Sequence, residues 1–290
     1  MSIEFKEEDK DFFIENGYLI YKNFFSADDI SIVRNFVNNI DFNTIDPRYL
    51  DSEPGVDTAV YQFLHEQDNC LGDLTNHQDI IDYTSFLMDD ETYIWSSKIN
   101  FKSPWHGRAE YWHNDYIYWK NRGYIKNNML TAMTFLDSHT IENAALHILP
   151  KSHKLKEIEH IDFLDINGLA KKMVPADVLN KLSSENPVIS IEASIGDVSF
   201  HHASTIHGSS HNIGPLSRKV LFSQINTHGN LPVNGFESAK EFNLKRTKYE
   251  IKELEKKLEK AKNKYQIQIS NSDEIISNSP ISKIEKDTTQ

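Results

Sequence analysis

The sequence predicts a mainly β protein with flanking helices, arranged as a sandwich or a barrel. After about residue 93, short runs rich in Ile, Val, Phe, Tyr and Thr alternate with turn residues, a spacing typical of folds with many short strands. Helical patterns are confined to the region before that point, to one insertion and to the C-terminal part. With 290 residues, of which 39% are hydrophobic and 26% charged, the chain has the composition of a globular protein that can bury a core.

The segment before residue 41 predicts a helix, a short strand and a second helix. Asn16 and Gly17 form a turn signal ahead of an apolar strand at 18–21. Ser26 precedes two acidic residues and suits the N-cap of the second helix. The apolar stripe of that helix consists of Ile30, Ile32, Val33, Phe36 and Val37.

The middle of the chain predicts a loop, a helix and then a series of strands. Residues 41–72 are rich in loop-forming residues, and residues 74–88 have a helical pattern. A helical insertion is expected at about 155–184, between the early and the late strands. The strands are expected at 93–101, 111–119, 129–136, 146–149, 188–193, 197–202, 205–207 and 219–225.

The C-terminal part differs from the rest, so we expect one domain over residues 1–235 followed by an appendage. Residues 240–264 contain ten Lys or Arg and five Asp or Glu, and residues 236–268 predict a charged amphipathic helix. This helix could form a homodimeric coiled coil or lie against the barrel. Residues 269–290 are polar, and we expect them to be disordered. The near-heptad apolar positions are Leu244, Ile251, Leu254, Leu258, Ala261 and Tyr265.

Composition argues against several classes of protein. The formal net charge of −12 disfavours non-specific nucleic-acid binding. No apolar run approaches the ~18 residues that a membrane span needs, and the acidic N-terminus does not resemble a secretory signal. A single cysteine, Cys70, cannot form an internal disulfide or a multi-cysteine zinc site. We therefore expect a cytoplasmic protein with no membrane or nucleic-acid partner.

The pattern His-x-Asp occurs three times, and two of the occurrences are poor candidates for a metal site. His77 and Asp79 lie in a helical context, where residues i and i+2 are about 200° apart and cannot converge on one ion. They are expected to be a surface pair near a helix N-terminus. His160 and Asp162 lie in the insertion, where a solvated loop is expected.

The third occurrence, His113 and Asp115, lies in the aromatic run at 111–119, predicted as a strand. On a strand, Tyr111, His113 and Asp115 would share one face, so both ligands could reach one metal ion. A buried histidine and aspartate are costly unless they bind a metal or pair with each other. A hydrogen-bonded core pair therefore remains the alternative.

A third ligand is expected between residues 196 and 210. If this segment is extended, His201 and His207 are about 20 Å apart at ~3.3 Å per residue, so only one of them can join the dyad. After His207, a turn leads to a strand that begins with Arg218 on its apolar face. Such an arginine suits a bidentate carboxylate partner, although a surface ion pair is the alternative. Two histidines and one carboxylate are typical of non-haem Fe(II) oxygenases, and Arg218 favours iron with a diacid co-substrate over zinc.

These residues belong to a set of motifs that resembles the phytanoyl-CoA dioxygenase family of Fe(II)/2-oxoglutarate-dependent oxygenases. The resemblance extends from about residue 12 to 225 and implies a double-stranded β-helix, a jelly-roll barrel. Two departures, Ala144 and Lys151, stand where the family usually has glycine, and they concern a connecting turn. The motifs follow in order at 13–20, 112–115, 143–154 and 196–218.

The resemblance also implies the roles of individual residues. His113, Asp115 and His207 would be the iron ligands. Arg218 would bind the distal carboxylate of 2-oxoglutarate, Ser209 would add a hydrogen bond, and Tyr111 would border the co-substrate. Because Asp115 is the carboxylate that halogenating relatives lack, hydroxylation is favoured over halogenation.

The expected function is therefore hydroxylation of an unactivated C–H bond of a small molecule, such as an amino-acid-derived compound or a specialised metabolite. Fe(II), 2-oxoglutarate and O₂ would be required, with release of succinate and CO₂. The same cofactors could instead serve desaturation, cyclisation or epimerisation, and a non-catalytic ligand-binding barrel is the alternative outside catalysis. Aromatic residues around the dyad could line a pocket or belong to the core, and two arginines could bind an anionic group or lie at the surface: Trp105, Trp112, Tyr116, Tyr118, Trp119, Arg108 and Arg122.

Overall fold

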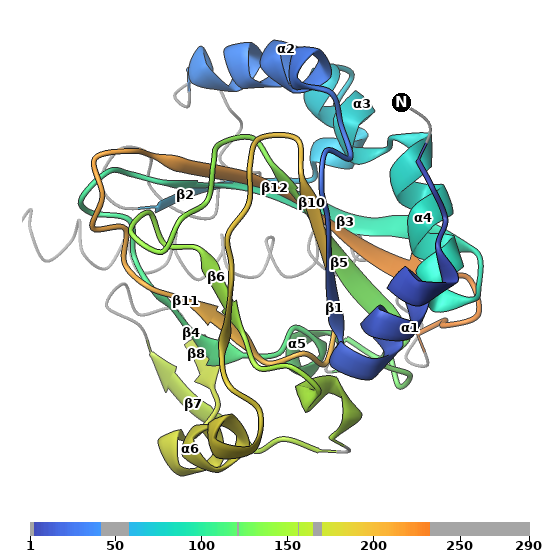
Figure 1. Ribbon diagram of the computed structural model, residues 1–290, viewed down its shortest axis with the longest axis vertical. Coiled ribbons are helices and arrows are strands. Elements are labelled where there is room, and N and C mark those ends of the chain that lie inside the picture. Colours follow the sequence, from blue (N-terminus) through green and yellow to red (C-terminus); the bar gives the residue numbers. More distant parts are fainter. Residues whose placement is uncertain (1–2, 42–57, 121, 156, 165–169, 233–290) are drawn as a thin grey trace, which may run out of the picture. The chain divides into compact units, whose positions relative to one another are not determined.

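Two antiparallel β-sheets form the centre of the structure, a computed structural model that describes residues 3–41, 58–120, 122–155, 157–164 and 170–232 (Figure 1). The larger sheet has the strand order β1 (Tyr18–Tyr21), β10 (Val198–His202), β5 (Met129–Phe135), β12 (Arg218–Thr227), β3 (Thr92–Lys102) and β2 (Thr58–Gln62). The smaller sheet has the order β4 (Glu110–His113), β11 (His207–Ser209), β6 (Leu146–Ile148) and β9 (Ile189–Ile191).

The connections between the two sheets are those expected for a jelly roll. From β3 onward, the chain passes to the smaller sheet at β4, returns at β5 and enters the smaller sheet again at β6. After β9, which is also in the smaller sheet, it alternates once more through β10, β11 and β12. Each pairing within the two sheets is antiparallel. The predicted mainly β fold with flanking helices is confirmed, whereas the predicted helix at 236–268 and tail at 269–290 lie outside the described residues.

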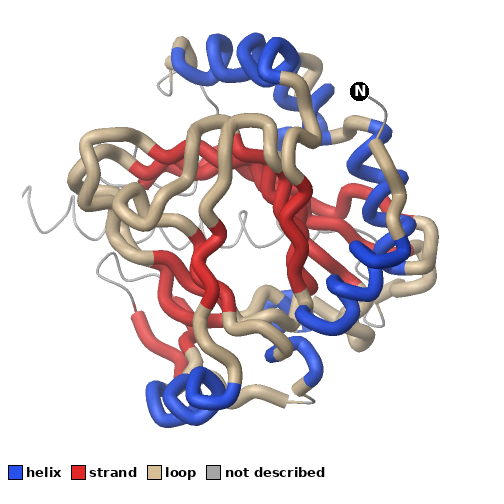
Figure 2. Tube along the Cα trace, viewed as in Figure 1, coloured by secondary structure: helices blue, strands red, loops and turns tan. Residues whose placement is uncertain are grey.

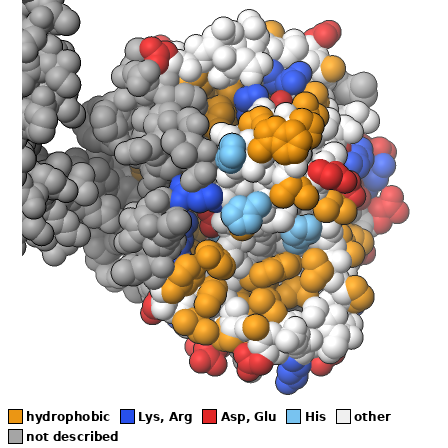
Figure 3. All heavy atoms as spheres, turned by 90° about the vertical axis from the view of Figure 1, so that its left-hand side faces the viewer, with side chains coloured by type: hydrophobic (Ala, Val, Ile, Leu, Met, Phe, Trp, Pro, Cys, Tyr) orange, Lys and Arg blue, Asp and Glu red, His pale blue; other side chains and the backbone are white. Residues whose placement is uncertain are grey.

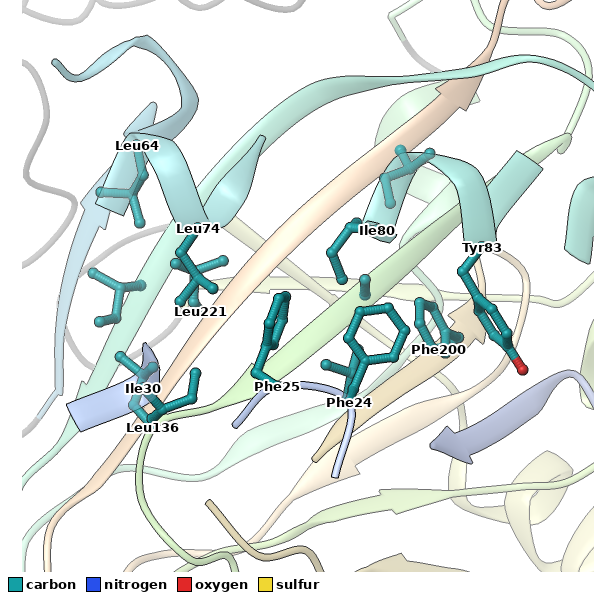
Figure 4. Close-up of a cluster of buried hydrophobic side chains, with 14 of the residues drawn as sticks. Phe24, Phe25, Ile30, Leu64, Leu74, Ile80, Tyr83, Leu136, Phe200 and Leu221 are labelled. Atoms are coloured by element: carbon teal, nitrogen blue, oxygen red, sulfur yellow. The ribbon is translucent and has the colours of Figure 1, made fainter. Parts of the chain in front are cut away.

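Helices cover the outer face of the larger sheet (Figure 2). They are α1 (Glu7–Asn16), α2 (Ala27–Asn38), η3 (Leu64–Glu66), α3 (Cys70–Thr75) and α4 (Gln78–Met88). A single apolar cluster joins these helices to β10 and β12, and Figure 4 shows Phe24, Phe25 and Phe200 within it. Because side chains alternate along a strand, Phe200 points to this cluster while its neighbour His201 points to the opposite face of β10.

The N-terminal elements agree with the predictions from the sequence. Strand β1 has the predicted bounds, and Gly17 takes a positive φ of 78° at the end of α1. The Ser26 hydroxyl accepts a hydrogen bond from the Asp29 amide at 3.2 Å, as expected of an N-cap. Strand β2, in the segment expected to be loop, was not predicted.

Two other predictions were wrong in their extent. Of the expected strand at 111–119, only 111–113 is strand, because the Asn114 side chain accepts a hydrogen bond from the Ile117 amide and the chain enters helix α5 (Tyr116–Lys120). The insertion is only partly helical: it holds a short 3₁₀ helix, then the hairpin of β7 and β8, and then a helix. These elements are η4 (Ser152–Lys154), β7 (Ile161–Leu164), β8 (Ala170–Met173) and α6 (Ala176–Glu185).

The remaining differences concern boundaries. The expected helix at 74–88 is two helices, α3 and α4, because His77 caps a new helix by accepting a hydrogen bond from the Asp79 amide. The expected strand at 205–207 begins only at His207, since the segment before it turns. None of the described helices is both long and apolar enough to cross a membrane.

Candidate active site

The candidate site consists of His113, Asp115 and His207, which come together where β4 ends and β11 begins in the smaller sheet. His113 ends β4, His207 begins β11, and the two residues are cross-strand neighbours. The Asp115 Oδ1 atom is 3.7 Å from His113 Nε2 and 3.8 Å from His207 Nε2. Two donor atoms that bind one ion at ~2.1 Å can be at most ~4.2 Å apart, and both Asp115 contacts meet this limit. One potential ligand atom from each of the three residues lies within 4.8 Å of the others, so the group found among the described residues could hold a single metal ion after a small inward shift.

Backbone carbonyl groups orient both imidazole rings. His113 Nδ1 lies 2.6 Å from the Tyr111 carbonyl oxygen, and His207 Nδ1 lies 2.9 Å from the Thr205 carbonyl oxygen. A carbonyl can only accept, so each Nδ1 donates and each Nε2 carries the lone pair that a metal requires. The local fold thus directs Nε2 of both histidines toward Asp115 Oδ1, where they could hold a metal ion.

The protonation states suit metal binding, with one proton to displace. Burial and the nearby His113 lower the pKa of His207 to about 3, so its ring is neutral. Burial opposes ionisation of Asp115, but the nearby imidazole rings of His113 and His201 hold the pKa of its carboxyl group well below the usual range. Burial also opposes charge on His113, yet the Asp115 carboxylate raises the pKa of that ring. A metal ion must compete with this proton.

A β-bulge in β4 changes which side chains face the ligands. His113 pairs with His207 whereas Glu110 pairs with Ser209, so three steps along β4 match two along β11. Glu110 therefore faces the site, and its charge contributes to the raised pKa of His113. The predicted face shared by Tyr111, His113 and Asp115 is wrong, because the bulge and helix α5 interrupt the alternation.

Two buried cations on the larger sheet lie near Ser209 of the smaller sheet. Arg218 and Lys102 are cross-strand neighbours on β12 and β3, and they are 2% and 1% exposed. Lys102 Nζ donates to Ser209 Oγ at 2.7 Å and to the Ser210 carbonyl at 3.1 Å. Arg218 Nη1 donates to the Ala144 carbonyl, and its Nε has no hydrogen-bond partner among the described residues.

This pair of cations is costly without an anion. Burial and then Arg218 lower the pKa of Lys102 well below its usual value. Burial also lowers the pKa of Arg218 to about 10. The arrangement is suited to a carboxylate that accepts from both side chains. Arg218 and Ser209 were predicted from the sequence, whereas Lys102 was not, because its position beside Arg218 depends on the register of β3 and β12.

The other candidate residues lie elsewhere. The Tyr111 ring is 51% exposed and packs edge-on against Phe163 of β7, with centroids 4.6 Å apart. His77 and Asp79 form the expected pair at the start of α4. Asp162 lies in β7 and pairs with Lys172 of β8, so the solvated loop expected there is wrong.

His201 is closer to the ligands than the extended spacing predicted. Residues 203–206 turn back, so the centroids of the His201 and His207 rings are only 4.8 Å apart. His201 Nε2 is 3.8 Å from Asp115 Oδ2, and Thr131 Oγ1 donates to the same oxygen at 3.0 Å. The expected separation of about 20 Å between His201 and His207 is therefore wrong, and Thr131 was not predicted from the sequence.

The aromatic residues around the dyad divide between core and surface. Trp119 is buried in a cluster with Trp95 and Tyr124, while Trp105 is 61% exposed. Tyr118 lies beside the His113 ring, with centroids 5.9 Å apart. Of these aromatic residues, Tyr118 therefore has the contact nearest to the potential ligands. Figure 3 shows histidine side chains at the surface of one face, among hydrophobic ones.

Comparisons with known proteins give a family match and related enzymes. The family model described as phytanoyl-CoA dioxygenase (PhyH) matches residues 13–220. An ectoine dioxygenase of Sphingopyxis alaskensis is 26% identical over 232 residues, which are 75% of this chain and 74% of that protein. An L-proline trans-4-hydroxylase of Streptomyces griseoviridis is 24% identical over 181 residues, or 59% of this chain and 68% of that protein.

A solved structure shares the fold. The crystal structure of EctD from S. alaskensis with 2-oxoglutarate and 5-hydroxyectoine superposes with a TM-score of 0.68 at 23% identity. The superposition covers 78% of each chain. The arrangement of the two sheets is therefore one that a known oxygenase also adopts.

Proposed function

Since the chain belongs to the phytanoyl-CoA dioxygenase family of Fe(II)/2-oxoglutarate-dependent dioxygenases, we propose that it hydroxylates an unactivated C–H bond of a small molecule. In this proposal the strands of the two central sheets act as a double-stranded β-helix that holds both cofactors. One observation carries it: a cluster of three potential ligands on the smaller sheet and a buried pair of cations on the larger sheet are connected through Ser209, which follows His207 on β11 and accepts a hydrogen bond from Lys102.

His113, Asp115 and His207 would hold the iron through two Nε2 atoms and Oδ1. Together, iron, 2-oxoglutarate and O₂ supply the oxidation of a C–H bond with release of succinate and CO₂. Arg218 and Lys102 bind the distal carboxylate, and Ser209 adds a hydrogen bond to it in place of its contact with Lys102.

The charges near the ligands favour a substrate with both an amino group and an acidic group. Glu110 faces the site through the bulge, and its ion pair with Lys171 is long, at 3.5 Å. Burial opposes ionisation of Glu110, but Lys171 and His113 hold its pKa below the usual range. Lys98 Nζ lies over the Phe222 ring at 5.3 Å on the same side of β3 as Lys102. Glu110 would bind the amino group and Lys98 the acidic group, consistent with relatives named for ectoine and L-proline.

The test is an anaerobic titration of the protein with Fe(II) and then 2-oxoglutarate, followed through the weak visible charge-transfer band of the chelate. The band should form with the wild type, be lost in His113→Ala and need far more 2-oxoglutarate in Arg218→Ala. A wild type that gives no band would overturn the proposal in favour of a non-catalytic binding protein. Product masses from an amino-acid screen then test the reaction: one added oxygen indicates hydroxylation, while loss of two hydrogens or an unchanged mass indicates desaturation, cyclisation or epimerisation.

We also propose that two copies associate through the charged helix expected at 236–268, in a cytoplasmic protein. The support is the near-heptad spacing of apolar residues such as Ile251, Leu254 and Leu258, within a segment rich in lysine. Deleting residues 240–290 should halve the mass measured by light scattering. An unchanged mass would contradict the dimer without affecting the assignment of the active site.

A further inference from the structure

His201 is a buried histidine that the proposed reaction does not yet use. It lies on β10, where its cross-strand neighbours are Tyr18 of β1 and Thr131 of β5. It is 1% exposed, and neither ring nitrogen has a hydrogen-bond partner among the described residues. An imidazole without partners in a protein interior lowers stability, since its polar atoms have lost water and gained nothing in return. A structural role in the fold therefore does not explain its presence.

The position of His201 relative to Asp115 suggests what it does. The two oxygens of Asp115 have different surroundings: Oδ1 faces the two histidine ligands, and Oδ2 faces Thr131 and His201. Thr131 already donates to Oδ2 at 3.0 Å, and His201 Nε2 is the other nitrogen within reach, at 3.8 Å. A shift of less than ~1 Å would make this contact a hydrogen bond.

The His201 ring also lacks the backbone anchor that the metal ligands have. His113 and His207 are each fixed by a carbonyl at Nδ1, so that Nε2 is presented to the ion. Among the described residues, nothing comparable holds His201. No hydrogen bond among the described residues fixes the orientation of the His201 ring, so the ring can turn toward the Asp115 carboxylate. It is not oriented as a fourth metal ligand.

We propose that His201 is a positioning residue that donates from Nε2 to Asp115 Oδ2 when a metal binds at Oδ1. This inference rests on the proposed function. With Thr131 and His201 donating to Oδ2, the carboxylate would hold the ion through Oδ1 alone. Hydrogen bonds of this kind to a ligating carboxylate typically change metal affinity by about 10- to 100-fold.

The experiment measures metal affinity and thermal stability of the full chain, without 2-oxoglutarate or substrate. Anaerobic Fe(II) titration and Co(II) absorption spectra are compared for the wild type and for His201→Phe. We expect His201→Phe to bind Fe(II) about 10- to 100-fold more weakly, while the melting temperature of the metal-free protein is unchanged or higher. A purely structural residue would show the opposite: a lower melting temperature and little loss of affinity.

A matched control is available in the same fold. His139 is also 1% exposed with both ring nitrogens unpartnered among the described residues, but it packs on Phe135 and lies beside Arg218 rather than Asp115. His139→Phe should leave Fe(II) affinity unchanged. Thr131→Val should weaken Fe(II) binding, and the double variant with His201→Phe should show a coupled effect because both groups act on one oxygen.

The outcomes separate this inference from the proposed function. If the wild type binds Fe(II), His113→Ala does not, and His201→Phe binds as tightly as the wild type, the positioning role is wrong and the metal site stands. If the Co(II) spectrum of His201→Phe shows a different coordination number from that of the wild type, then His201 is a ligand and the positioning role is also wrong. If the wild type binds no metal, the proposed function fails together with this inference.

Discussion

Replacing Lys102 offers the sharpest test of the cofactor assignment. The substitution should weaken the binding of 2-oxoglutarate but raise the stability of the metal-free protein. The Lys102 ammonium group is 1% exposed, beside Arg218, and its acceptors are the neutral oxygens of Ser209 and Ser210. Methionine has a similar unbranched shape without the charge. In Lys102→Met, the distal carboxylate of 2-oxoglutarate would lose one charged hydrogen-bond donor and keep Arg218.

The loss of a hydrogen bond to a charged group costs about 1.5–3 kcal/mol, which corresponds to about 10- to 150-fold weaker binding of 2-oxoglutarate. The metal-free protein should instead gain stability, because a desolvated charge next to Arg218 is removed. A gain of about 1 kcal/mol would raise the melting temperature by about 2–4 °C in a chain of this size.

The pH dependence of this gain has a definite sign. The pKa of Lys102 is lowered by burial and by Arg218, so the folded state binds this proton less tightly than the unfolded state. The penalty is therefore largest at low pH and disappears as the pH rises from the folded pKa to the ordinary value of 10.5. The stabilisation by Lys102→Met should shrink over that window.

Two measurements check the reasoning. The charge-transfer titration gives the affinity for 2-oxoglutarate, and thermal melts at several pH values give the stability. Lys10→Met is the control, because Lys10 forms a surface pair with Asp89 and should change neither by much. Unchanged affinity for 2-oxoglutarate in Lys102→Met would refute the position of the distal carboxylate, and a lower melting temperature would refute the claim that the charge is a net cost.

Three further predictions address the metal, the substrate and the fold. Burial lowers the pKa of His113, but Asp115 raises it by more, and the ring must lose its proton to bind a metal. Fe(II) affinity should therefore rise as the pH increases through this raised pKa and then level off. A flat pH profile would contradict the assignment of His113. Glu110→Gln should raise KM for an amine-bearing substrate about 10-fold or more while the affinity for 2-oxoglutarate changes little, as steady-state kinetics and the titration can show; equal losses in both would argue against a substrate contact. Ser26→Ala should lower the free energy of unfolding by about 1 kcal/mol through loss of the helix cap, and an unchanged denaturation midpoint would show that the cap contributes nothing.

The sequence was informative where the signal is local and failed where register decides. The dyad and the arginine could be found from residue types and spacing, and the Ser26 cap and strand 18–21 follow from short patterns. The bulge in β4 could not be predicted, because it depends on how β4 pairs with β11, and it exchanges Tyr111 for Glu110 on the inner face. The turn before His207 likewise brought His201 to Asp115, where an extended chain would have kept it away.

The buried polar atoms without partners predict that iron and 2-oxoglutarate strongly affect the stability of this protein. Atoms of His201, Asn100 and Arg218 lie on β10, β3 and β12 of the larger sheet, and each is unpartnered among the described residues. Each lowers the stability of the metal-free protein, and each would be compensated only when a ligand or a metal-ordered carboxylate supplies the missing bond. Ligands that bind the folded state alone stabilise it by about 2.7 kcal/mol at 100 times Kd. The rise in melting temperature on adding Fe(II) and 2-oxoglutarate together should therefore be larger for the wild type than for Lys102→Met or His201→Phe. This holds even where the ligand-free variants have the higher melting temperature.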